Sequence, residues 1–145
     1  ICACLVGSEM CIRDRYKYTP GAKFIDGTGA TKPAEVVERP EITDECAIQA
    51  VLYEAKDAEG NEVILTGHDI NTSAYRVAAA VLADGTAKAA YTYFDIPFTY
   101  VNGKTYEAGK EYKLAIVCSS SKEGDSFKGA GGSTLWIDEL EIIGE

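Results

Sequence analysis

The chain has 145 residues, enough for one modest hydrophobic core, and carries a formal net charge of −9 at pH 7. Such an acidic chain lacks the basic patch that phosphate backbones and anionic lipid surfaces require, so we expect no nucleic-acid partner. Its apolar runs are too short to span a bilayer, so this sequence predicts no direct membrane insertion.

The first 15 residues, which end in "CLVGSEMCIRDR", show neither helical nor strand periodicity. The transposon end of tagmentation sequencing libraries, ATG TGT ATA AGA GAC AG, translates to residues 10–14 and most of an arginine codon. The adaptor upstream of it, CTC GTG GGC TCG GAG, gives residues 5–9 in the same frame. A signal peptide would need a charged start, an apolar core and a small-residue cleavage site, which this stretch lacks. We predict that residues 1–15 are translated adaptor and that residues 16–145 are the native part.

An adaptor-derived segment has no evolved place in a fold. We therefore expect residues 1–15 to form a tail, or at most a makeshift strand on an open edge. The apolar side chains of Leu5, Met10 and Ile12 should then bury little surface.

The remaining chain contains short apolar runs separated by turn signals such as Asp84-Gly85 and Asn102-Gly103. The alanine-rich run from Ala74 to Gly85 has helical propensity, but its Asp-Gly turn and strand-like neighbours favour a strand. The stretch from Ala22 to Asp44 is predicted to be a surface loop. The predicted strands are Ala47–Ala55, Glu62–Gly67, Ala74–Gly85, Tyr91–Val101, Tyr112–Ser119 and Ser133–Ile143. This pattern is typical of an all-β antiparallel sandwich or barrel.

Strand alternation assigns the side chains to two faces. The predicted core residues are Cys46, Ile48, Ala50, Leu52, Phe94, Ile96, Phe98, Tyr100, Leu135 and Ile137. The side chains predicted to point away from the core are Gln49, Val51, Tyr53, Tyr91, Tyr93, Asp95, Thr99, Trp136 and Asp138. Pro97 cannot donate a ladder hydrogen bond, so its strand should lie at an edge or carry a bulge.

The outward-facing residues have the chemistry of a sugar-binding surface, because aromatic rings stack on sugar rings while amides, carboxylates and guanidinium groups bind hydroxyls. Tyrosine is also an ordinary strand residue, so a structural role is the alternative for each ring. The candidate ligand-binding residues are Tyr16, Tyr18, Gln49, Tyr53, Arg76, Tyr93, Trp136 and Asp138, with Tyr91 and Asp95 beside them.

The sequence contains few cysteine and histidine residues that could bind a metal ion or act as a nucleophile. Outside residues 1–15 the cysteines are Cys46 and Cys118, too few for a thiolate zinc site; we expect two buried thiols, with one disulfide as the alternative. His68 lies in "TGHDI" without a nucleophile elbow, and we expect it in a turn or at a strand end. No cofactor is predicted. In the long loop Ser119–Ser133, Asp125 with serine hydroxyls and backbone carbonyls could hold calcium.

An enzyme is the competing hypothesis. Glycosidases need two carboxyl groups at a defined separation. The available clusters are Asp44-Glu45 and Asp138-Glu139, and adjacent strand residues point to opposite faces. One member of each cluster would have to converge on the other for a catalytic pair to form.

Several segments resemble one family. They are "YKYTPG" from Tyr16, "DECAIQAVLYEA", "YFDIPFTY" and above all "YKLAIVCSSSKEGDSFKGAGGSTLWIDELEI". The chain from Tyr16 onward resembles the putative carbohydrate metabolism domain at the C-terminus of secreted or surface proteins of gut bacteria. A Lys-Gly-Tyr lead-in is expected where Arg13-Asp14-Arg15 stands, which is where the predicted adaptor ends.

This resemblance implies a jelly-roll β-sandwich similar to carbohydrate-binding modules, with its first strands and a preceding immunoglobulin-like domain lying outside this chain. It also implies a secreted or cell-surface location. Together with the outward-facing rings, it leads us to expect non-catalytic glycan binding in polysaccharide utilisation. The alternatives are a glycoside hydrolase with paired carboxylates and a structural or adhesive sandwich module.

Overall fold

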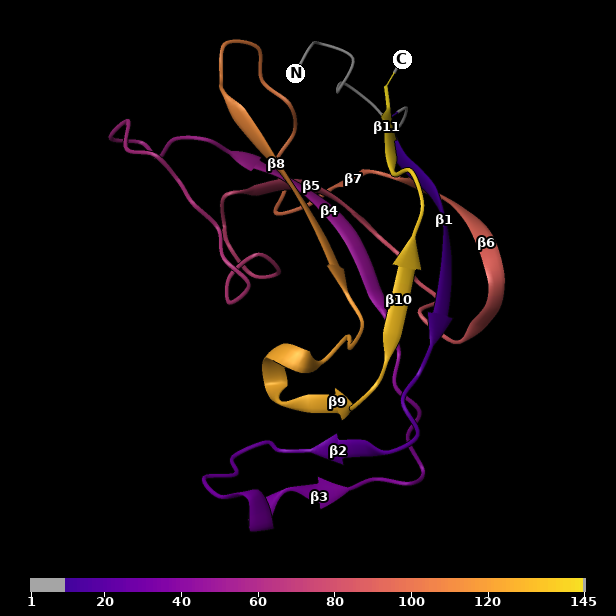
Figure 1. The fold of residues 1–145 in the computed structure, drawn as a ribbon. Helices are drawn as coiled ribbons and strands as arrows, with labels where there is room; N and C mark the ends of the chain where they lie inside the picture. The colour runs from indigo at the N-terminus through magenta and orange to yellow at the C-terminus, as the bar shows by residue number, and fades with distance from the viewer. Residues whose placement is uncertain (1–9, 145) are drawn as a thin grey trace.

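The computed structural model describes residues 10–144, and these residues are organised almost entirely as β-strands (Figure 1). The strands are β1 (Cys11–Thr19), β2 (Phe24–Asp26), β3 (Val37–Glu38), β4 (Ala47–Glu54), β5 (Arg76–Val81), β6 (Lys88–Pro97), β7 (Thr99–Tyr100), β8 (Tyr112–Ser119), β9 (Lys128–Ala130), β10 (Thr134–Ile137) and β11 (Glu141–Ile143). The helical elements of this described part are two 3₁₀ turns, η2 (Pro33–Glu35) and η3 (Gly124–Ser126). The predicted all-β architecture is confirmed.

The strands form antiparallel sheets. In the first sheet, β1 lies in the middle and pairs with β6 on one side and with β10 and β11 on the other. The second sheet has the order β7-β5-β4-β8, and the third has the order β3-β2-β9. Figure 1 shows the third sheet lying crosswise to the long strands of the other two.

The core lies between the first and second sheets. Tyr16 and Tyr18 of β1 pack in one buried cluster with Ile48 and Leu52 of β4 and with Phe94 of β6. These side chains are inward-facing because each strand alternates its residues between two faces. Burial of this cluster is the main stabilising contribution to the sandwich.

The predicted alternation is confirmed in β4, β6 and β10. Cys46, Ile48, Ala50 and Leu52 are each at most 2% exposed, and Leu135 and Ile137 pack against the core. Tyr100 lies opposite Ala78 of the core and so is on the predicted face, but it is 37% exposed because β7 is the edge strand of the second sheet. Within the described residues β6 pairs with β1 alone, so Pro97 lies on an edge strand as predicted.

The second sheet is covered on its outer side as well. Val51 and Ala79 face away from the core, yet they are buried under Ile70 and Leu65 of the loop between β4 and β5. The predicted strand Glu62–Gly67 lies in this loop and is wrong, because its only pairing is an isolated bridge between Lys56 and Glu62. The apolar residues of that run cover the sheet without joining it.

The connecting segments and turns differ in part from the predictions. The predicted surface loop Ala22–Asp44 does lie mostly at the surface, but it contains the short elements β2, β3 and η2. The Asn102-Gly103 turn is confirmed, and both residues have positive φ. Gly85 is required for another reason, since a β-carbon there would collide with the carbonyl of Cys46.

The two native-segment cysteines differ in burial. Cys46 and Cys118 are free thiols, and burial raises the pKa of Cys46 to about 11. Cys118 is exposed, against expectation, because β8 is an edge strand. Its inward-facing neighbour Ile116 is 43% exposed, and Ile142 on the first sheet is 36% exposed. Within residues 10–144, inward-facing side chains of β8 and β11 are therefore partly exposed to solvent.

Residues 10–15 do not behave as expected of an adaptor tail. Met10 is 6% exposed and Ile12 is fully buried, both within the main core, so the expectation that they bury little is wrong; Leu5 lies outside the described residues. Strands pair through backbone hydrogen bonds, so an unrelated sequence could also extend β1. Met10 and Ile12, however, both point into the core. Their burial counts against the adaptor origin, which stays a prediction.

Asp14 is the inward-facing residue of this segment that does not suit its position. It is 7% exposed; its Oδ1 accepts a hydrogen bond from the backbone N–H of Arg15, while its Oδ2 is buried without a partner. Burial raises the pKa of this carboxyl group. A buried acceptor without a partner costs about 1–3 kcal/mol.

We predict that Asp14→Val stabilises the chain by about 1–3 kcal/mol near neutral pH, because valine suits an inward strand position and leaves no unpaired oxygen. The pKa of Asp14 is raised on folding, so the folded chain holds this proton more tightly than the unfolded chain does. The variant's advantage should therefore grow as pH rises from the ordinary Asp range through the raised pKa. Urea unfolding at several pH values measures both effects.

The matched control is Glu139→Val, which replaces an exposed carboxylate and should change the free energy of unfolding by less than about 0.5 kcal/mol. A loss of stability in Asp14→Val would show that the carboxylate has a favourable partner in solution.

Candidate functional site

The outer face of the first sheet carries three exposed aromatic side chains. Tyr91 and Tyr93 on β6 are 52% and 56% exposed, and Trp136 on β10 is 37% exposed. All three alternate with inward-facing core residues, so the packing that buries Phe94 and Ile137 fixes these rings on the solvent side. We call Lys17, Tyr91, Tyr93 and Trp136 the aromatic face.

The aromatic face spans three adjacent strands. β1 lies between β6 and β10, with Arg15 opposite Tyr93 and Lys17 opposite Trp136. Strands that flank a common neighbour are about 10 Å apart, and Tyr93 and Trp136 are also offset by two residues along β1, so their Cα atoms are separated by roughly 12 Å. The ammonium group of Lys17 lies 4.6 Å from the centroid of the Trp136 ring, within the range of a cation–π interaction.

A hollow of about 320 Å³ adjoins this face. It is lined by Arg13, Asp14, Arg15, Tyr93, Asp138, Glu139 and Glu141. Arg13 is already paired with Asp95, with 3.0 Å between Nε and Oδ2. The hollow thus places carboxylate and guanidinium groups next to an aromatic ring, which is the combination that orients sugar hydroxyls.

The structure divides the predicted ligand-binding residues. Tyr93, Trp136 and Asp138 lie on the outer side of the first sheet, as the alternation predicts. Tyr16 and Tyr18 are core residues, 2% and 1% exposed, so their predicted exposed position is wrong. Burial raises the pKa of both phenols, whose hydroxyls donate to the backbone carbonyls of Asp84 and Ser120, each at 2.7 Å.

Gln49, Tyr53 and Arg76 belong to the second sheet. Gln49 and Tyr53 do face away from the core, but they are only 8% and 7% exposed. Their predicted accessibility to a ligand is therefore wrong. Arg76 is half-buried; its Nη1 donates to the carbonyl of Asn71 at 2.6 Å, and its Nε is buried without a partner.

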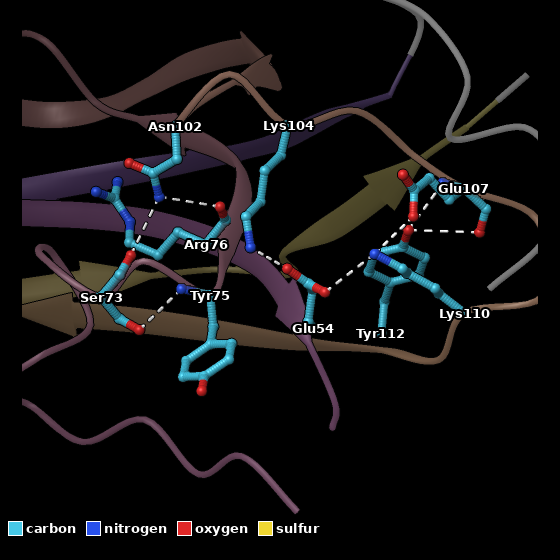
Figure 2. A network of polar contacts seen from close by, with 9 residues as sticks. All are labelled: Glu54, Ser73, Tyr75, Arg76, Asn102, Lys104, Glu107, Lys110 and Tyr112. Atoms are coloured by element: carbon cyan, nitrogen blue, oxygen red, sulfur yellow. Dashed lines mark hydrogen bonds and ion pairs between the residues drawn. The ribbon is translucent and has the colours of Figure 1, made fainter. Parts of the chain in front are cut away.

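Figure 2 shows that Arg76 lies near a polar network at the end of β4. Glu54 is its centre and forms ion pairs with Lys104 and Lys110. Burial raises the pKa of Glu54, but hydrogen bonds and charge from the two lysines outweigh it, so the net pKa is lowered. Lys104 also lies 5.7 Å from the ring centroid of Tyr75.

This network holds loops together. Asn102 donates from Nδ2 to the carbonyls of Ser73 and Arg76, both at 3.1 Å, and so ties the β7–β8 connection to the start of β5 (Figure 2). Lys104 of the same connection donates a hydrogen bond to the carboxylate of Glu54 at the end of β4. The carboxylate of Glu54 is occupied by Lys104 and Lys110, which fits a structural role.

The predicted carboxylate clusters line different hollows. Asp44 and Glu45 line one and Asp138 and Glu139 line another, so the convergence that a catalytic pair requires is not formed. Asp44 is 2% exposed, and its Oδ2 accepts hydrogen bonds from Ser121 Oγ, Ala130 N and Ser133 Oγ at 2.6–2.9 Å. Asp44 therefore organises the loop that precedes β10.

We predict that Asp44→Asn lowers the free energy of unfolding by about 3 kcal/mol, because an amide nitrogen cannot accept bonds and the loop hydroxyls lose a charged partner. Chemical denaturation measures this change.

Glu45→Gln serves as its control. Glu45 forms only a solvent-exposed contact of 3.8 Å with Lys122, so its loss should cost under about 1 kcal/mol. Equal stability of Asp44→Asn and the unaltered chain would contradict the structural role of Asp44.

The calcium prediction receives no further support. Asp125 lies in η3 at the surface, and within residues 10–144 the structure places no group of three or more acidic, histidine or cysteine side chains suited to a metal ion. Calcium at Asp125 stays a prediction. His68 lies in a turn, as expected.

A model of the family described as "Putative carbohydrate metabolism domain" matches residues 8–143. The chain belongs to this family. The resemblance of the segments from Tyr16 onward is thereby confirmed, and the match begins inside the predicted adaptor segment. In the described part of the chain, no helix has the length and apolar character needed to cross a membrane.

Two solved structures are similar to this member of the family. A putative glycoside hydrolase from Bacteroides thetaiotaomicron is 33% identical, with a TM-score of 0.79, over 97% of this chain and 39% of that chain. A putative glycoside hydrolase from Bacteroides vulgatus is 34% identical, with a TM-score of 0.73, over 95% of this chain and 53% of that chain. This chain therefore spans less than two thirds of either protein. No curated protein matches it.

Sequence reasoning missed Lys17. The signal was present, because Lys17 lies between Tyr16 and Tyr18 and must face opposite to both on a strand. It was overlooked because the two tyrosines were themselves assigned to the exposed surface.

Proposed function

We propose that the chain is a non-catalytic glycan-binding module that uses the aromatic face. The observation that supports this most is the exposure of three aromatic rings on one side of one sheet, beside a hollow of charged groups. Exposed aromatic groups of this extent are uncommon unless they serve binding. Membership in a carbohydrate-metabolism family favours a sugar as the ligand.

The chemistry of each part is distinct. The flat indole of Trp136 and the rings of Tyr91 and Tyr93 offer apolar surfaces to the C–H faces of sugar rings. Asp138 and Glu139 can accept hydrogen bonds from hydroxyl groups, and Lys17 can donate one. Rings that lie on either side of β1 and are offset along it would contact successive parts of an extended glycan chain.

The proposal does not depend on the predicted adaptor residues. Lys17, Tyr91, Tyr93 and Trp136 all lie outside residues 1–15 and are held in place by β6, β10 and the native part of β1. Arg13 and Arg15 line the hollow but are not required for ring stacking.

Glycoside hydrolysis is the second candidate, favoured by the carboxylates that line the hollow and by the similar Bacteroides proteins. A hydrolase needs one carboxyl group with a raised pKa. Burial raises the pKa of Asp14, but its side chain is only 7% exposed and its Oδ2 is buried, so we do not assign it a catalytic role. Non-catalytic binding is therefore the better-supported function, and a secreted or cell-surface location accords with it.

We predict that Trp136→Ala weakens glycan binding by about 1–3 kcal/mol, the range of anchor residues in binding sites, and changes stability less. A glycan array identifies the ligand, isothermal titration calorimetry measures its affinity, and a product-release assay on the same glycan tests turnover. The matched control is Tyr75→Ala, because Tyr75 is also 37% exposed but lies beside the Glu54 network.

Release of sugar products would overturn the non-catalytic assignment. Equal loss of affinity in both variants would contradict the aromatic face as the binding surface.

A further inference from the structure

A second surface hollow, of about 860 Å³, lies over the third sheet and η3. Its walls are mostly apolar and include Ile25 of β2, Pro33 of η2, Val36 and Phe127, with Thr31 and Ser121 among the polar residues. None of these residues belongs to the aromatic face or to the Glu54 network. The third sheet that carries the hollow lies apart from the long strands in Figure 1.

Phe127 is the unusual residue of this hollow. Its side chain is 75% exposed, the most exposed of the large apolar residues that the structure describes. Its backbone has a φ of 59°, in the left-handed region that is unfavourable for a non-glycine residue. Neither burial nor backbone preference therefore explains a phenylalanine at this position.

The surrounding backbone holds Phe127 in this conformation. Its N–H donates to the carbonyl of Gly124 at 3.1 Å, and its own carbonyl accepts from the N–H of Gly27 at 2.8 Å. A β-carbon at Gly27 would lie 3.1 Å from that carbonyl oxygen, so the close approach requires glycine. The exposed ring is thus presented on a backbone that is fixed from both sides.

The charged residues that line the hollow are both cationic, although the chain as a whole is acidic. They are Lys32 and Lys128. Lys128 lies 3.8 Å from Glu123 and directly opposite Asp26 in the sheet, so two carboxylates adjoin it. The nearby carboxylate of Glu35 accepts hydrogen bonds from the N–H and hydroxyl of Thr31 and from the N–H of Lys32, so it is occupied by the loop itself.

We propose that this hollow binds an acidic sugar, a hexuronate residue of a glycan. The ring face of the sugar would stack on Phe127, its carboxylate would interact with Lys32 and Lys128, and its hydroxyls would bond to Thr31 and Ser121. The charge of the lysines selects an anionic ligand, and the apolar walls select a ligand with an apolar face. This site is additional to the aromatic face and does not rest on it.

The probes are oligosaccharides of galacturonate, glucuronate and mannuronate, each in its acid form and as its methyl ester, titrated calorimetrically into the full chain. We expect at least one acid form to bind about tenfold more tightly than its ester, which keeps the ring but lacks the charge. This preference should weaken as salt is added.

Three variants locate the site. Phe127→Gly removes the ring and suits the left-handed backbone, so it should keep or raise the melting temperature while losing at least tenfold in uronate affinity. Lys128→Gln should also weaken binding of the acid form. Lys23→Gln removes a highly exposed lysine that does not line the hollow, and it should leave uronate affinity unchanged.

The proposal can be contradicted by binding results. Absence of binding by all three acids, equal binding of acids and esters, or unchanged affinity in Phe127→Gly would each overturn the proposal. Trp136→Ala distinguishes the two sites, since it should weaken binding at the aromatic face and leave uronate binding at Phe127 intact. Loss of uronate binding in Trp136→Ala with retention in Phe127→Gly would assign the acidic sugar to the aromatic face instead.

Discussion

The structure depends on the alternation of side chains along β1, the strand that is hydrogen-bonded on both sides in the first sheet. Tyr16 and Tyr18 must face inward, because their rings fill the space against β4 and their hydroxyls bond to the backbone carbonyls of Asp84 and Ser120. A shift of one residue would bring the charge of Lys17 into the core and expose both tyrosine rings to solvent, which would destabilise the sandwich. With this register fixed, Trp136 and Tyr93 are held on the opposite side.

The two large sheets differ in what covers their outer sides. The loop between β4 and β5 covers part of the second sheet and buries Val51 and Ala79, and Gln49 and Tyr53 on the same side are also buried. The outer side of the first sheet keeps exposed aromatic residues on both flanks of β1. This asymmetry explains why the residues that remain candidates for sugar binding belong to one sheet. The loop that Asp44 organises sets the start of β10 and so supports Trp136 indirectly.

Much of the fold could be predicted because strand periodicity is a local signal. Tyr112–Ser119 has the predicted bounds, and the inward set of β4 is correct. Exposure depends on contacts between distant segments, so it was harder to predict: nothing in "AIQAVLYEA" reveals that Gln49 and Tyr53 are buried. Tyr16 and Tyr18 were misplaced because tyrosine suits both a core and a binding surface. The backbone of Phe127 gives no sequence signal, since αL residues are usually glycine or asparagine.

The central claim is that a glycan lies across the aromatic face, and NMR titration of the full chain with an array-identified glycan tests it most directly. The account predicts that the largest shift changes fall on the Trp136 indole N–H and on the backbone amides of Lys17 and Tyr93. The amides of Gln49 and Tyr53, in the second sheet, should stay unchanged. Shift changes confined to the second sheet, or centred on the Glu54 network, would contradict the account.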